Sequence, residues 1–159
     1  MLATTTRRTF RALALIPALM FVAACDDDDD PLVPSDPADD VEAVSITVTP
    51  PGGTAATYVF DQNDNPTITL GVGANTVTSR FVDADGATVA LGANFRLDFE
   101  SLPTGVTFAR SATDAYAGTI TVPEGVTTGT GVAVLFHIPS NHDDLEAPFT
   151  ITVTAPAAP

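Results

Sequence analysis

Apolar and polar residues alternate along most of the chain after residue 40. In five segments the alternation has a period of two residues, which is typical of β-strands with one buried face. The apolar positions of these segments are Val44, Ile46 and Val48; Ile68, Leu70 and Val72; Phe95, Leu97 and Phe99; Val132, Val134, Phe136 and Ile138; and Phe149, Ile151 and Val153. Weaker strand candidates lie at 55–60, 76–82, 87–91, 106–110 and 115–122.

Turn-forming sequences separate these segments. They are PPGG at 50–53, DQNDNP at 61–66, DADG at 83–86, and GAN at both 73–75 and 92–94. About ten short strands, spaced roughly 8–12 residues apart, are typical of an antiparallel sandwich or barrel. We therefore expect an all-β fold with one domain over residues 41–159.

The sequence SITVTP opens this region, FVDADGATV lies in its middle and FTITVT closes it. In strand rhythm and turn style, residues 43–154 resemble the bacterial immunoglobulin-like (Ig-like) domains of surface proteins. The resemblance implies an antiparallel Ig-like β-sandwich that serves as a spacer, adhesin or recognition unit for a protein or glycan ligand. The antibody-type subclass is excluded, because the chain has one cysteine and no tryptophan.

Residues 1–24 have the pattern of an export signal peptide. They contain three arginines and no acidic residue, and residues 12–24 form an apolar stretch. That stretch is shorter than the roughly 20 residues a spanning helix needs, so a signal peptide fits better. The pair Arg7 and Arg8 resembles the twin-arginine export motif, and the general secretory route remains the alternative.

The sequence VAAC at 22–25 resembles the lipobox of bacterial lipoproteins. The resemblance implies that Cys25 receives a diacylglyceryl group and becomes the N-terminus after cleavage of the signal peptide. Acyl chains would then anchor the protein to a membrane of the cell envelope, facing the periplasm or the cell surface. Residues 25–40 contain eight aspartates, which predict a disordered acidic tether between the anchor and the β-domain.

Composition narrows the range of functions. The chain has 20 acidic residues against 6 basic ones and a formal net charge of -14, which would repel a nucleic-acid backbone. All six basic residues are arginines, which excludes lysine-based Schiff-base and phosphate-loop chemistry.

Catalytic signatures are scarce. The chain contains no G-x-S-x-G, H-E-x-x-H or glycine-rich dinucleotide motif. Two of the four glutamates, Glu42, Glu100, Glu124 and Glu146, could act as the acid and base of a glycosidase-type hydrolase, although no spacing favours one pair. We therefore expect a non-catalytic binding or structural module rather than an enzyme.

The two histidines form the most focused candidate site. His137 is expected to share a strand face with Ala133 and Leu135, and a loop after Pro139 could return His142 towards it. With Asp143, Asp144 or Glu146, two imidazoles would supply three or four ligands for Zn²⁺ or Cu²⁺. The simpler alternative is an ordinary strand histidine followed by a solvated turn with an internal hydrogen bond.

A possible calcium loop begins at Asp83 and Asp85 in the sequence DADG. The later ligand positions of such a loop hold Thr88 and Ala90 and no glutamate follows, whereas Asp-Gly between alternating segments is a typical hairpin turn. The hairpin turn is the favoured interpretation.

Overall fold

The structure is a computed structural model that describes residues 36–155. A short 3-10 helix, η1, covers Pro37–Asp40 and precedes nine strands. The strands are β1 (Ala43–Thr49), β2 (Ala56–Phe60), β3 (Thr67–Gly71), β4 (Gly73–Val82), β5 (Phe95–Glu100), β6 (Thr107–Arg110), β7 (Ala117–Val122), β8 (Thr128–His137) and β9 (His142–Thr154). The predicted signal peptide and lipobox lie outside the described residues.

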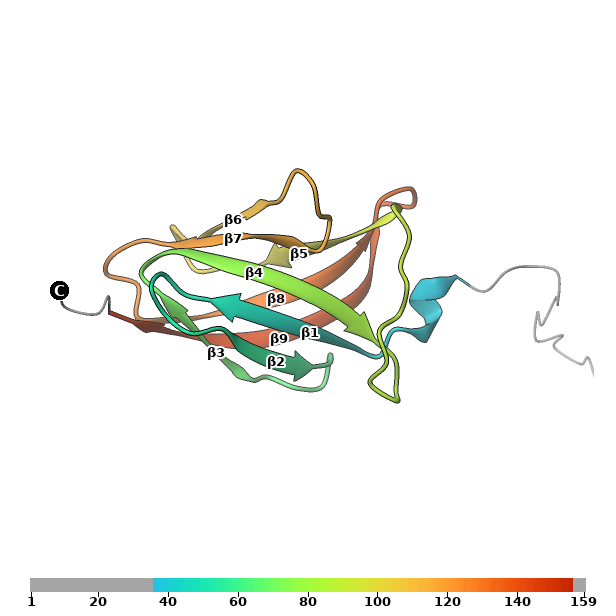
Figure 1. Cartoon of the computed structure of the whole chain (residues 1–159), viewed down its shortest axis with the longest axis horizontal. Helices are drawn as coiled ribbons and strands as arrows, with labels where there is room; N and C mark the ends of the chain where they lie inside the picture. Colours follow the sequence, from blue (N-terminus) through green and yellow to red (C-terminus); the bar gives the residue numbers. More distant parts are fainter. Residues whose placement is uncertain (1–35, 156–159) are drawn as a thin grey trace, which may run out of the picture. The chain divides into compact units, whose positions relative to one another are not determined.

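The strands form a two-layer β-sandwich, as the alternating pattern predicts (Figure 1). One sheet has the order β2-β1-β4-β7-β6 and the other the order β3-β9-β8-β5. The pairing is antiparallel except between β3 and β9, which run parallel. This exception arises because the chain leaves the first sheet after β2, adds β3 to the edge of the second sheet, and returns to the first sheet with β4.

The core lies between the two sheets and is built from the alternating apolar positions. Val44, Ile46 and Val48 of β1 are each at most 1% exposed, whereas the intervening Ser45 and Thr47 are only half-buried. Burial of one apolar face per strand is the main force that selects this register. The five strongly alternating segments all lie wholly or mostly within strands.

Strand β8 buries the less apolar of its two faces. Ala133 and Leu135 point into the core, while Ile138 beyond the strand end is 44% exposed. The four apolar positions Val132, Val134, Phe136 and Ile138 therefore point away from the core, on the outer face of the sheet. Among them only Val134 is fully covered by neighbouring residues.

Two local expectations differ from the structure. Residues 87–91 form no strand, and only an isolated bridge joins Val82 to Thr88. The folded domain also begins earlier than residue 41, because η1 packs on the sandwich and Ala38 is only 9% exposed within the core cluster. The methyl group of Ala38 contacts the core, which the aspartate-rich sequence around it gives no reason to expect.

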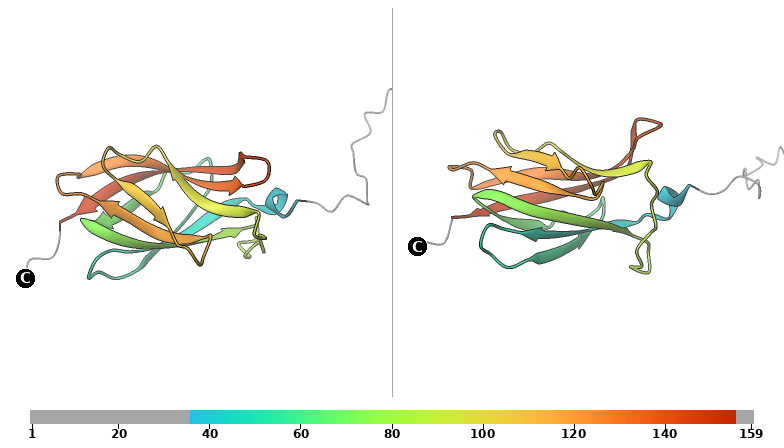
Figure 2. Two further views of the ribbon diagram at one scale, coloured as in Figure 1. Left: turned by 90° about the horizontal axis from the view of Figure 1, so that it is seen from above. Right: turned by 45° about the horizontal axis from the view of Figure 1, so that its top comes forward.

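The two ends of the sandwich differ. In Figures 1 and 2, η1 and the hairpin between β8 and β9 lie at one end, and β9 finishes at the other. In the part of the chain that the structure describes, no helix has the length and apolar character needed to cross a membrane.

Candidate metal centre

A tight hairpin brings the two histidines together, as the sequence predicts. His137 ends β8, His142 begins β9, and the two residues are direct partners in the strand register. The connection is only residues 138–141, and Asn141 has the left-handed φ of 54° that asparagine tolerates better than most residues. Its N–H donates to the carbonyl oxygen of His137 at 3.0 Å, which closes the turn.

A β-bulge in this hairpin delivers the third candidate ligand. Leu135 pairs with Leu145, but Phe136 pairs with Asp143, so Asp144 is an extra residue in β9. A bulge disrupts the alternation of faces and redirects side chains locally. It places His142 opposite His137 and turns Asp144 towards both of them.

The three side chains form a compact donor cluster. One ligand atom from each of His137, His142 and Asp144 lies within 4.8 Å of the others. His142 Nε2 is 2.6 Å from Asp144 Oδ1, and His137 Nδ1 is 3.8 Å from Asp144 Oδ2. The first two atoms are in close contact, whereas the second pair is too far apart for a hydrogen bond.

Two atoms of the cluster are buried without a partner among residues 36–155. These atoms are His137 Nδ1 and Asp144 Oδ2. The side chain of His137 is 16% exposed and that of Asp144 is 14% exposed, so water has little access to either. Because unsatisfied buried polar atoms cost free energy, the pair is a natural place for a bound cation or proton.

The ring of His137 is held in place by an aromatic neighbour. It stacks on Phe95 of β5 with a centroid separation of 4.4 Å and an interplanar angle of 23°. The ring of His142 lies 5.3 Å away at an angle of 63° and remains half-exposed. One imidazole is therefore fixed and the other can adjust.

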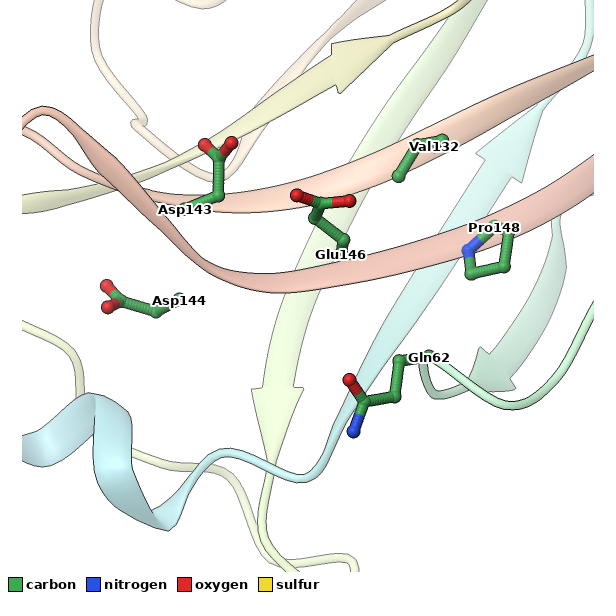
Figure 3. A pocket seen from close by; sticks show the side chains of 6 residues that line it. All are labelled: Gln62, Val132, Asp143, Asp144, Glu146 and Pro148. Carbon is green, nitrogen blue, oxygen red and sulfur yellow. The ribbon is translucent and has the colours of Figure 1, made fainter.

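Asp143 does not join the cluster, in contrast to the sequence-based expectation. It pairs with Phe136 on the opposite face of the hairpin, because the bulge separates it from its neighbour Asp144. Figure 3 shows Asp143 and Glu146 on one side of the strand and Asp144 on the other. Of the three carboxylates named from the sequence, Asp144 is the one that lies in the cluster with the two histidines.

A shallow cleft of about 440 Å³ lies along this part of β9 (Figure 3). Its lining consists of Gln62, Val132, Asp143, Asp144, Glu146 and Pro148. Strand β3 pairs with β9 only from Thr150 onward, so the cleft follows a segment of β9 that β3 leaves uncovered. The carboxylates of Asp143, Asp144 and Glu146 all border this cleft.

Asp83 and Asp85 form the turn that the sequence favours. One oxygen of Asp83, Oδ1, accepts the N–H groups of Asp85 at 3.0 Å and Ala87 at 2.8 Å. Gly86 has a φ of 79°, a conformation that glycine adopts without strain. This carboxylate is committed to the turn, and the calcium loop has no support from these contacts.

The glutamates are distributed over the sandwich. Glu42 precedes β1 and Glu124 follows β7, which places them at opposite ends of the same sheet. Glu146 lies on the outer face of β9, opposite Val134. Glu100 of β5, opposite Val132, shares this outer face and lies on the other side of β8.

Searches against models of protein families and against curated protein sequences found no significant match.

Proposed function

We propose that this protein is a lipid-anchored cell-envelope protein whose β-sandwich is a non-catalytic binding module of the Ig-like type. The order of the chain supports the proposal, because a basic and apolar start is followed by Cys25, an aspartate-rich stretch and then a folded domain. Two acyl chains on Cys25 would be sufficient for stable attachment to a membrane.

The anchor is tested by intact-mass measurement of protein extracted from membranes. We expect a chain that begins at residue 25 and carries acyl groups, and a Cys25→Ser variant that lacks them and dissociates from the membrane. An unmodified thiol on the wild-type protein, or its release without detergent, would contradict the anchor.

We infer that the ligand of the module is a divalent transition metal. The observation that carries this inference is the convergence of His137, His142 and Asp144, with one donor atom from each within 4.8 Å of the others. Two imidazole nitrogens suit Zn²⁺ or Cu²⁺, whereas Ca²⁺ prefers sites built entirely from oxygen ligands. The close contact between His142 and Asp144 would be replaced by metal–ligand bonds on loading.

Calorimetric titration of the full chain carrying Cys25→Ser tests the metal site without interference from the thiol. We expect one Zn²⁺ per chain near neutral pH, with loss below about pH 6, because protons compete for the imidazole nitrogens. His137→Ala, His142→Ala and Asp144→Asn should each remove binding.

Asp143→Asn is the matched control, because it neutralises the adjacent carboxylate on the opposite face and should leave binding unchanged. Undiminished binding in the double histidine variant would place the metal elsewhere, most plausibly on the aspartates at 26–30. Equal losses in the Asp143 and Asp144 variants would indicate a general charge effect rather than coordination.

A further inference from the structure

Asp36, the first described residue, lies beside the metal-ligand cluster although it is 101 positions away from His137 in the sequence. Its Oδ2 is 3.9 Å from His137 Nδ1, on the same nitrogen that faces Asp144 Oδ2 at 3.8 Å. A buried imidazole nitrogen thus faces two carboxylates and makes no hydrogen bond to any residue in the 36–155 range.

The position of Asp36 is set by its own helix. Its Oδ1 accepts the N–H of Ala38 at 3.0 Å and so caps η1, while Ala38 itself is packed against the core. The cap uses one carboxylate oxygen and leaves Oδ2 for another partner. Because the side chain is 40% exposed, it can move by a fraction of an ångström without disturbing the core.

We infer that Asp36 is the fourth ligand of the metal centre, so that a bound metal joins the start of the domain to the β8–β9 hairpin. This inference rests on the metal site proposed above. Tetrahedral Zn²⁺ has bonds of about 2.0–2.1 Å to nitrogen and oxygen, which places its donors about 3.3–3.4 Å apart. His137 Nδ1 is 3.9 Å from Asp36 Oδ2 and 3.8 Å from Asp144 Oδ2, which is within about 0.6 Å of that spacing for both carboxylates. Asp36 lies outside the three residues whose donor atoms are all within 4.8 Å of one another, so its carboxylate would have to move towards His142 and Asp144 when the metal binds.

The charge of the site supports four ligands. Two neutral imidazoles and two carboxylates carry a charge of 2−, which a divalent cation neutralises. A closed set of four protein ligands is typical of structural rather than catalytic zinc. The centre would therefore fix the geometry of the domain rather than activate a substrate.

A ligand bond from Asp36 would attach the segment through which the chain enters the domain more firmly to the sandwich. Residues 36–42 are otherwise held by the burial of Ala38 and by backbone bonds from Val41 to Ala38 and from Glu42 to Val82. A ligand bond from Asp36 would add a link to strands β8 and β9. Metal would then fix residues 36–42 against the hairpin between β8 and β9.

Asp36→Asn in the full chain carrying Cys25→Ser tests this inference. Asparagine caps helices as well as aspartate does, so the variant keeps η1 while weakening the metal bond. We expect it to bind one Zn²⁺ with a dissociation constant at least tenfold higher, measured by competition with a chromophoric chelator. Asp39→Asn, which neutralises another acidic residue of the same helix, is the control and should bind as the parent chain does.

Hydrogen exchange measured by mass spectrometry provides the second readout. Zn²⁺ should slow exchange in a peptide covering residues 36–42 of the parent chain and of Asp39→Asn, and should do so much less in Asp36→Asn. Equal zinc affinity and equal protection in the two variants would overturn the role of Asp36 and leave the three-residue site intact. Failure of the parent chain to bind zinc would overturn the proposed function itself.

Discussion

Asn75 is expected to be the most costly polar residue to remove from this domain. It is fully buried between the sheets, at the point where the chain returns from β3 to β4. Its Nδ2 donates to the carbonyl oxygens of Gly71 at 2.8 Å, Gly73 at 3.1 Å and Ile120 at 3.2 Å. Its Oδ1 accepts the N–H of Gly71 at 2.7 Å.

The magnitude follows from these four hydrogen bonds. Each contributes a net of about 0.5–1.5 kcal/mol, and buried groups left without a partner cost about 1–3 kcal/mol. The bonds share one side chain and are not independent, so we expect Asn75→Ala to lower the free energy of unfolding by about 3 kcal/mol. For a domain of this size that loss corresponds to a decrease of about 10 °C in Tm.

Urea unfolding followed by circular dichroism measures the difference. Asn94→Ala is the matched control, because Asn94 ends the second GAN sequence and is exposed. It should change the free energy of unfolding by less than about 0.5 kcal/mol. A loss below about 1 kcal/mol in Asn75→Ala, or similar losses in both variants, would refute the reasoning.

Three further predictions concern packing, pH and salt. Gly118→Ala would place a Cβ 2.6 Å from the carbonyl oxygen of Ala109 and should destabilise the domain by about 1–3 kcal/mol in chemical denaturation, whereas Gly92→Ala meets nothing within 4 Å and should be neutral. Burial, and secondarily the charge of Asp114, raise the pKa of Tyr116 above 10.0, so the folded state favours the neutral phenol and the free energy of unfolding should fall as the pH rises above about 10. In the Tyr116→Phe variant the free energy of unfolding should fall less steeply with pH than in the wild-type protein. Equal slopes for the two proteins would contradict the prediction. Residues 41–159 contain 12 acidic residues against 3 arginines, so Tm measured by calorimetry should rise with NaCl as repulsion is screened, and a flat or falling curve would show that local pairing already compensates the charge.

The sequence by itself determined the five strongly alternating segments that become strands, although the weaker candidate at 87–91 forms none. Alternation such as Val44, Ile46 and Val48 is a local property, since successive side chains of a strand point to opposite faces wherever the strand packs. An antiparallel sandwich or barrel follows, because many half-apolar strands can bury their faces only against one another, and the structure has the sandwich. The pairing of the two histidines was also anticipated, because they flank a short connection after an alternating segment.

Features that depend on contacts between distant segments of the chain were decided only by the tertiary structure. The two GAN sequences are identical, yet Asn75 is buried in a strand and Asn94 is exposed in a turn, because only the first lies where the chain crosses between sheets. The bulge that selects Asp144 over Asp143 depends on the register of β9 against β8, and no local pattern encodes it. Asp36 reaches His137 because Ala38 finds a place in a core assembled from distant strands. Such contacts depend on which distant residues the whole fold brings together. The pattern of side chains along one segment does not predict them.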